Sequence, residues 1–296
     1  MRGLEITTVK SIKSTEFCYG VKQAIKIALD TCANNENKKI FMYGPIVHND
    51  DVIFNLQKKG IQCVNKIDKI TKNDVLIIRA HGISKLEYNK IINIGATIVD
   101  ATCPYVKKIH KIVSKEFKNM RKIIIIGNKK HSEVKGINGW CENSAEIIEH
   151  EHEIDDIFLK KIKNFNSDIC IVSQTTFNKK YFEKIIYILM EKIKNIKYFD
   201  TICESSSTRQ KESEDIAKNS DIVFVIGGNK SSNTNKLFEI CKEFCENVFK
   251  IENAEETKKY KHLINKTSKV GITLGASTPD SSVKEVLFEL SKIYDL

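Results

Sequence analysis

Residues 100–134 read DATCPYVKKIHKIVSKEFKNMRKIIIIGNKKHSEV, and this stretch contains the unit that decides the fold. Cys103 stands directly before a run whose apolar residues recur at helical spacing over residues 106–117. The run KIIIIG that follows is short, continuous and β-branched, which is typical of a buried strand. A polar loop carrying His131 and Glu133 comes next. The stretch therefore predicts a helix, a strand and then a loop whose side chains can do chemistry.

The same order of elements occurs three times, at intervals of roughly a hundred residues. Cys18, Cys103 and Cys203 each precede a helical pattern, over residues 21–31, 106–117 and 209–218. Each helix is followed by a strand with a polar loop, in KIFMYGPIVHN, KIIIIGNKKHSEV and DIVFVIGGNKSSN. A later strand in each repeat also has a polar end, in VLIIRAHG, ICIVSQTTF and VGITLGAST. The chain thus predicts three copies of one supersecondary unit.

Strands that alternate with helices and consist of near-continuous Val and Ile runs indicate parallel sheets covered on both faces. The fold class is therefore α/β, and we expect three pseudo-symmetric units arranged as a trefoil. We place the unit boundaries at the cysteines, giving residues 18–102, 103–202 and 203–296. The N-terminal strand, over residues 4–9 within residues 1–17, resembles the strands before Cys103 and Cys203. We expect it to complete the third sheet.

Polar side chains gather where the predicted strands end, and in parallel sheets those ends line the ligand crevice. The first loops of the repeats carry His48, then His131 with Glu133, then Ser231, Ser232 and Asn233. The second loops carry His81, then Thr175 with Thr176, then Ser277 with Thr278. Taken singly, Ser231 would be a helix N-cap and Glu133 a first-turn glutamate. Their recurrence at equivalent strand ends makes them candidates for a site.

Composition excludes several classes of protein. With 41% hydrophobic and 29% charged residues in 296, the chain is typical of a globular protein, and its apolar runs are too short to span a membrane. Residues 1–10 lack the features of a secretory signal or a transit peptide, so we expect a cytoplasmic protein. The net charge of +10 comes from scattered lysines. It indicates anionic small substrates and acidic electron carriers more than nucleic acid.

The nine cysteines fit reduced thiols better than a disulfide framework. Cys18, Cys103 and Cys203 occupy equivalent loops at predicted helix N-termini, where the helix dipole stabilises the thiolate that binds metal. We expect the others to be core residues, namely Cys32, Cys63, Cys141, Cys170, Cys241 and Cys245. Three thiolates from distant loops do not resemble a zinc finger. A [4Fe-4S] cluster fits better, with one iron left open to substrate.

The segments carrying these residues resemble, in order and along essentially the whole chain, the motifs of the 4-hydroxy-3-methylbut-2-enyl diphosphate reductase family. They are FCYGVKQAI, GPIVHN, AHGIS, DATCPYVKKIH, HSEVKG, SQTTF, DTICESSSTRQ, GGNKSSNTNKL and GITLGASTPD. The resemblance implies a trefoil around a central cluster. It also implies reductive dehydroxylation of the diphosphate substrate to isopentenyl and dimethylallyl diphosphate, the last step of the methylerythritol phosphate pathway, with electrons from a ferredoxin or flavodoxin.

The resemblance implies a role for each matching position. Cys18, Cys103 and Cys203 match the cluster ligands. The diphosphate-binding residues are matched by His48, His81, Ser231, Asn233 and Ser277, and other polar residues of the pocket by His131 and Ser232. Glu133 and Thr175 match the proton relay, with Thr176 beside it.

The chain departs from the family pattern at Asn128, where a histidine is usual, at Ser132, where a proline is usual, and at Glu204 after the third cysteine. Two rival functions remain open. A cluster-containing electron carrier or sensor would explain the cysteines but would not explain the polar loops. A zinc hydrolase would use His and Glu, although the sequence has no HExxH motif. We assign no function to His110, His150, His152 and His262.

Overall fold

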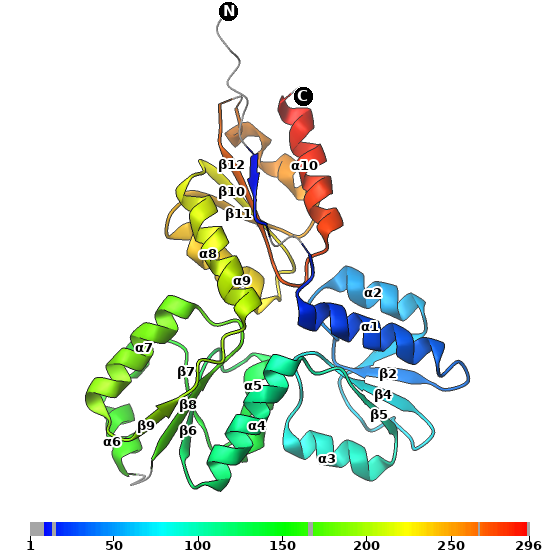
Figure 1. Ribbon diagram of the computed structural model, residues 1–296. Coiled ribbons are helices and arrows are strands. Elements are labelled where there is room, and N and C mark those ends of the chain that lie inside the picture. Colours follow the sequence, from blue (N-terminus) through cyan, green and yellow to red (C-terminus); the bar gives the residue numbers. More distant parts are fainter. Residues whose placement is uncertain (1–8, 14–15, 165–167, 266, 295–296) are drawn as a thin grey trace, which may run out of the picture. The chain divides into compact units, whose positions relative to one another are not determined.

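The computed structural model describes residues 9–13, 16–164, 168–265 and 267–294. Within these ranges the strands form three four-stranded sheets in which every pairing is parallel. Helices connect the strands (Figure 1). The predicted α/β class and its three repeating units are confirmed. No helix among the described residues is both long and apolar enough to cross a membrane.

The first sheet has the strand order β3-β2-β4-β5. Its unit runs through α1 (Tyr19–Ala33), β2 (Ile40–Tyr43), α2 (Asp50–Lys58), β3 (Ile61–Val64), β4 (Val75–Ile78), α3 (Lys85–Ile94) and β5 (Thr97–Asp100). Ser84 and Glu87 form a capping box that begins α3, and Gly95 ends this helix in the left-handed conformation. The four residues of β4 are buried, as expected of a central strand.

The second sheet has the order β7-β6-β8-β9. Its unit runs through α4 (Pro104–Lys118), β6 (Lys122–Ile126), α5 (Ser132–Asn138), η1 (Gly139–Cys141), β7 (Glu146–Ile148), η2 (Glu151–Glu153), α6 (Asp156–Asn164), β8 (Ile169–Ser173), α7 (Lys179–Lys192) and β9 (Ile196–Tyr198). Val106, Ile109 and Val113 form the buried face of α4. Their spacing is that of a helix lying on a sheet.

The third sheet has the order β1-β12-β10-β11. Its elements are β1 (Val9–Ser11), α8 (Glu204–Lys218), β10 (Ile222–Ile226), α9 (Ser232–Lys242), β11 (Asn247–Ile251), η3 (Ala254–Leu263), β12 (Val270–Leu274) and α10 (Asp280–Tyr294). The strand predicted over residues 4–9 lies mostly outside the described residues. The described strand β1 pairs with β12 in parallel, with Val9 opposite Val270 and Ser11 opposite Ile272.

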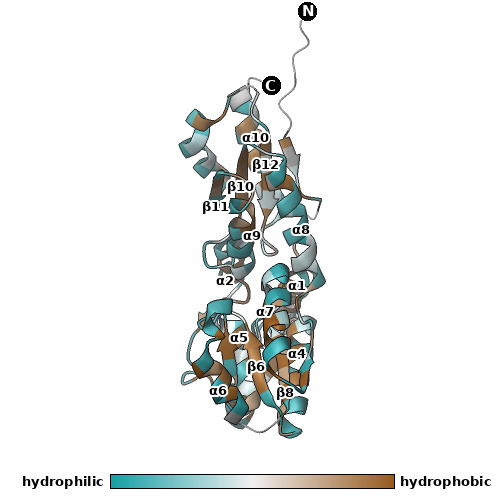
Figure 2. Ribbon diagram, turned by 90° about the vertical axis from the view of Figure 1, so that its left-hand side faces the viewer, coloured by the Kyte–Doolittle hydropathy of each residue, from teal (hydrophilic) through white to brown (hydrophobic). Residues whose placement is uncertain are grey.

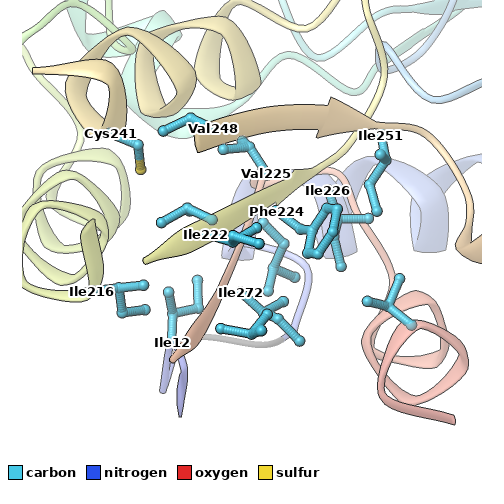
Figure 3. Packing of buried hydrophobic residues seen from close by; sticks show 14 of the residues in the cluster. Ile12, Ile216, Ile222, Phe224, Val225, Ile226, Cys241, Val248, Ile251 and Ile272 are labelled. Carbon is cyan, nitrogen blue, oxygen red and sulfur yellow. The ribbon is translucent and has the colours of Figure 1, made fainter. Parts of the chain in front are cut away.

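The apolar residues of the strands make the core of each sheet. In the third sheet the buried side chains of β10 form one apolar cluster with Ile12, Ile216, Ile272 and Cys241 (Figure 3). Figure 2 shows the same pattern by colour, with hydrophobic strands beneath helices of mixed polarity. Burial of apolar area at about 25 cal/mol per Å² is the main stabilising contribution to such a core.

Contacts divide the described chain into two compact bodies. The one-sheet body comprises residues 9–18, His48–Asp50 and residues 204–294, and it holds the third sheet. The two-sheet body comprises residues 19–47 and 51–203, and it holds the first and second sheets. The boundaries that we placed at the three cysteines stay a prediction.

The expectation of a core position is correct for some of the cysteines without a predicted function and wrong for others. Cys141, Cys170, Cys241 and Cys245 are buried. Cys32 and Cys63 are only half-buried. Cys63 lies on β3, which is the edge strand of its sheet, and Cys32 lies near the C-terminal end of α1. Apolar periodicity does not distinguish an edge from a centre, so the sequence pattern misplaced both.

Candidate active site

The three units share a turn after their first strand. The amide of the glycine that ends each strand donates to the last residue of the neighbouring strand: Gly44 to Val64 O at 2.7 Å, Gly127 to Ile148 O at 2.8 Å, and Gly227 to Ile251 O at 2.9 Å. Four residues beyond these glycines stand His48, His131 and Ser231. The repeat seen in the sequence is therefore a repeat of backbone hydrogen bonds. It gives these three side chains equivalent places in their units.

A second shared hydrogen bond ties each candidate ligand cysteine to the second polar loop of the preceding unit, which for Cys18 is the third unit. The amide of Cys18 donates to Ala276 O at 3.0 Å, that of Cys103 to Ala80 O at 3.0 Å, and that of Cys203 to Thr175 O at 2.9 Å. The residue after each of these acceptors is Ser277, His81 or Thr176. Each cysteine is thus fixed beside a predicted substrate-binding loop of the preceding unit.

The three cysteines form no disulfide bond with the described residues, are half-buried, and lie directly before α1, α4 and α8. Helix N-termini carry partial positive charge. Space beside Cys103 is kept by Gly20, because a Cβ at Gly20 would lie 2.5 Å from the Cys103 Sγ. Partly accessible cysteine side chains at helix starts are suitable donors for an iron-sulfur cluster, which is held by cysteine sulfur.

Glu133 and Thr175 form a buried pair between α5 and the loop after β8. The Thr175 amide donates to Glu133 Oε1 at 2.6 Å, and the Thr175 hydroxyl donates to Glu133 Oε2 at 2.8 Å. Only 2% of Glu133 is exposed. Burial raises the pKa of Glu133 to about 7, against the opposing effect of the two hydrogen bonds from Thr175. When the carboxyl group is protonated it can donate to the Thr175 hydroxyl, which accepts as readily as it donates.

Thr175 also connects this carboxyl group to a candidate cluster ligand. Its amide and hydroxyl bind Glu133, while its carbonyl accepts the amide of Cys203. The three residues therefore form one hydrogen-bonded chain inside the two-sheet body. A proton held on Glu133 is separated from the Cys203 backbone by a single residue.

His81 and His131 also meet in the two-sheet body. Their rings contact edge to face, with centroids 5.5 Å apart. His131 is the N-cap of α5, and its Nδ1 accepts the Glu133 amide at 3.2 Å. In the neutral imidazole the remaining proton then belongs to Nε2, which makes this atom a donor.

In the one-sheet body, α9 presents a donor that no group among the described residues accepts. Ser231 caps the helix by accepting the Thr234 amide at 3.3 Å. Asn233 is buried, and its Oδ1 accepts from the Ser206 hydroxyl at 3.3 Å. Its Nδ2 has no partner among the described residues. A buried N–H group without an acceptor costs about 1–3 kcal/mol, so this amide is suited to an incoming anionic oxygen.

His48 and Ser277 lie beside each other in the same body. The Asn49 side chain donates to Ser277 O at 2.7 Å, and the Ser277 hydroxyl lies 3.4 Å from His48 O. A Cβ at Gly228 would come within 2.9 Å of His48 O, so glycine is needed there for the close approach. These contacts fix the backbone of His48 against the third unit.

The predicted residues thus fall into two groups. The two-sheet body brings together Cys103, Cys203, His81, His131, Glu133 and Thr175. The one-sheet body brings together Cys18, His48, Ser231, Ser232, Asn233 and Ser277.

Residues that the sequence analysis did not select also shape these loops. The Gln174 side chain accepts the Asn128 amide at 3.1 Å and donates to the Thr176 hydroxyl at 3.0 Å. Ser206 orients Asn233, and Arg209 donates to Glu16 O at 2.6 Å, close to Cys18. The polar run ESSSTRQ could have indicated Ser206 and Arg209, because a helix with so few apolar residues must bury polar ones.

The three departures from the family pattern have local explanations. Asn128 holds its turn through Lys130 N at 2.8 Å and Glu149 Oε1 at 2.9 Å. Ser132 is the first residue of α5, a position that proline also favours. Glu204 is exposed at the start of α8, where the helix dipole favours a carboxylate.

Comparison with known proteins agrees with this arrangement. A family model described as LytB protein matches residues 9–291. The chain belongs to the LytB family. A relative from Caldanaerobacter subterraneus, named 4-hydroxy-3-methylbut-2-enyl diphosphate reductase, is 39% identical over 94% of this chain and 94% of its own length. A relative of the same name from Clostridioides difficile is 40% identical over 96% of this chain and 99% of its own length.

Other family members differ in length. A Clostridium tetani relative of the same name is 42% identical, but this chain covers 43% of it.

Among solved structures, the Plasmodium falciparum E-1-hydroxy-2-methyl-but-2-enyl-4-diphosphate reductase has a TM-score of 0.88 and 26% identity, covering 97% of this chain and 88% of that one. The structure titled (E)-4-hydroxy-3-methyl-but-2-enyl diphosphate reductase, the terminal enzyme of the non-mevalonate pathway, has 31% identity and a TM-score of 0.66, covering 96% and 99%. The family resemblance read from the motifs is confirmed.

Proposed function

We propose that this protein is an iron-sulfur reductase that removes the hydroxyl group of 4-hydroxy-3-methylbut-2-enyl diphosphate. The products are isopentenyl and dimethylallyl diphosphate, and the reaction closes the methylerythritol phosphate pathway. Membership of the LytB family and the names of the relatives support this reaction. The observation that carries it is the buried Glu133, held by Thr175 with a pKa of about 7 beside the Cys203 backbone.

Cys18, Cys103 and Cys203 would hold one [4Fe-4S] cluster, with the fourth iron left without a protein ligand. Three arguments support this set: equivalent positions in the three units, the shared amide hydrogen bond, and cysteines outside any disulfide at helix starts. When bound, the cluster supplies the electrons and a Lewis-acidic iron.

The diphosphate group would be bound by His48, His81, Ser231, Asn233 and Ser277, with His131 and Ser232 lining the same pocket. The unpartnered Nδ2 of Asn233 supports this, since a phosphate oxygen would satisfy it. Hydroxyl and imidazole groups add further donors to a multiply charged anion. The buried setting strengthens each of these hydrogen bonds relative to water.

Glu133 would deliver a proton to the departing oxygen. The overall change takes up two electrons and two protons, breaks the carbon–oxygen bond, forms a carbon–hydrogen bond and releases water. Hydroxide is a poor leaving group, so one proton must reach the oxygen as the bond breaks. A carboxyl group with a pKa of about 7 is protonated in a large fraction of molecules at neutral pH. Thr175 would keep that proton in place through its hydroxyl.

We propose a ferredoxin or flavodoxin as electron donor and the cytoplasm as compartment, with no nucleic acid partner. The net charge of +10 supports an acidic protein partner and an anionic substrate.

Anaerobic purification followed by iron, sulfide and zinc analysis tests the proposal, together with turnover of the diphosphate substrate by a reduced dye. We expect about four irons and four sulfides per chain and release of both products. Zinc without sulfide would instead favour the hydrolase. A full cluster without turnover would favour an electron carrier or sensor.

A further inference from the structure

The two-sheet body contains a pocket that none of the proposed catalytic or binding residues lines. Its volume is about 240 Å³, below the range of about 300–1,000 Å³ of sites for drug-sized ligands. Its apolar and aromatic lining residues are Ile78, Ile83, Tyr88 and Trp140. Its polar lining residues are Asp100, Thr102, Lys107, His110 and Lys111. A few convergent polar groups in an apolar pocket are typical of a small-molecule site.

His110 is the pocket residue whose buried ring nitrogen lacks a hydrogen-bond partner among the described residues. It is 6% exposed, its ring stacks on Trp140 with centroids 5.2 Å apart, and its Nε2 has no hydrogen-bond partner among the described residues. Burial lowers the pKa of His110 to about 4, more than Asp100 raises it, so the ring is neutral at physiological pH. A buried imidazole normally has a partner, because leaving one unsatisfied costs free energy.

The charges around the pocket leave one positive group available. Asp100 is already engaged, since its Oδ1 accepts the Thr102 amide at 2.9 Å and its Oδ2 lies 2.8 Å from Lys107 Nζ. Lys107 and Asp100 therefore offset each other. Lys111, one helical turn further along α4, is exposed at the pocket and forms no ion pair with the residues that the structure describes. The pocket thus carries a net positive charge, from Lys111, and an aromatic ring, that of Trp140.

We propose that this pocket binds a small organic anion, a carboxylate or a phosphate monoester on an apolar body. The anionic group pairs with Lys111 and hydrogen-bonds to the His110 imidazole, and the apolar body packs on Ile83 and Trp140. The proposal goes beyond the reductase function and does not depend on it.

The pocket adjoins the candidate active site through two direct links. Thr102 precedes Cys103 in the chain. His110 packs under the turn that follows His81: Gly82 has φ +71, and a Cβ there would lie 2.5 Å from His110 Cε1. An occupant that orders His110 therefore also restrains the turn carrying His81.

Trp140 is the only tryptophan in the sequence and lines this pocket, so tryptophan fluorescence comes from a residue of the pocket. We would titrate the anaerobically purified, cluster-loaded protein with 3-phenylpropionate and with phenyl phosphate, and detect binding independently by saturation-transfer NMR of the probe. The uncharged 3-phenylpropanamide serves as the control ligand. We expect saturable binding of at least one anion, and binding of the amide weaker by about fivefold or more.

Matched variants on α4 locate the site. Lys111→Ala should weaken anion binding by about fivefold, whereas Lys108→Ala, an exposed lysine outside the pocket, should leave it unchanged. His110→Phe keeps an aromatic ring against Trp140 but removes its hydrogen bond, and should weaken binding by a similar factor. Absence of saturable binding by both methods at millimolar probe overturns the proposal. So does equal affinity for the amide, or an equal effect of Lys108→Ala and Lys111→Ala.

Discussion

At the scale of the residue, environment decides what a side chain can do. Glu133 is a first-turn glutamate of α5, a position that usually holds an exposed carboxylate near the helix dipole. Here burial outweighs the dipole and the two hydrogen bonds from Thr175, and the pKa rises to about 7. The carboxyl group is therefore a proton donor and not only a helix-stabilising charge.

Glu133→Gln should keep the fold and the iron, because the glutamine oxygen can accept the Thr175 amide and its NH₂ can donate to the Thr175 hydroxyl. Glutamine has no proton to give, so turnover should fall by about a hundredfold or more. Anaerobic turnover with a dye reductant, measured beside iron content, tests this. Near-normal turnover in a fully loaded variant would contradict the role of Glu133.

The pH dependence of turnover should show the same group. Because the pKa of Glu133 is raised to about 7, the protonated form is abundant below that pH and is lost as pH rises through it. The turnover number should therefore decline above about pH 7 in the unmodified protein. Glu133→Gln should lack this decline in its residual turnover. A decline of the same shape in both proteins would assign it to another group.

Asn233→Ala should weaken binding of inorganic diphosphate by about 10- to 100-fold, the size of a lost charge-assisted hydrogen bond. Asn235→Ala on the same helix is the matched control, since the Asn235 side chain is already bonded to Asn229 O at 3.2 Å and to Lys250 at 2.7 Å. Isothermal titration of both variants gives the comparison. Equal binding by the two would remove Asn233 from the site.

At the scale of the element, α8 both follows one candidate ligand and restrains another. It begins directly after Cys203, and its Arg209 is buried. The Arg209 guanidinium donates to Glu16 O at 2.6 Å and also bonds to Ser205 within the helix. Because Glu16 stands two residues before Cys18, the helix restrains the loop that carries this thiol.

Arg209→Met should leave the Glu16 carbonyl without this donor and destabilise the protein by about 1–3 kcal/mol. We also expect faster loss of iron to a chelator, because the Cys18 loop is then less restrained. Lys211→Met, exposed on the same helix, is the control. Chemical denaturation and chelator kinetics measure the two effects. An unchanged rate of iron loss in Arg209→Met would show that Arg209 does not restrain the loop that carries Cys18.

At the scale of the whole molecule, three copies of one unit supply three equivalent cysteine positions. Each of Cys18→Ser, Cys103→Ser and Cys203→Ser should remove most of the bound iron, because two thiolates do not hold the cluster securely. Cys241→Ser is the control, since Cys241 is buried in the core of the third sheet. Iron and sulfide analysis of anaerobically purified variants measures this. Full occupancy in the three ligand variants would refute the assignment.

The sequence alone determined the α/β class, the three units and the loops that carry the candidate site. These properties follow from local patterns: apolar runs of strand length, helical periodicity, and polar residues directly after a strand. Such patterns depend only on residues close together in the sequence. His48, His131 and Ser231 could therefore be identified as equivalent positions of the three units without coordinates. The family motifs added their proposed roles.

Only the tertiary structure decided the properties that depend on partners far along the chain. Glu133 meets Thr175 across 42 residues, and Arg209 meets Glu16 across 193. Burial of Glu133 and His110 moves their pKa values in opposite directions, up for the acid and down for the base. Cys63 lies half-buried on an edge strand, whereas its apolar periodicity predicts a core position. Desolvation and long-range hydrogen bonds arise only when distant segments pack together, and no local pattern encodes them.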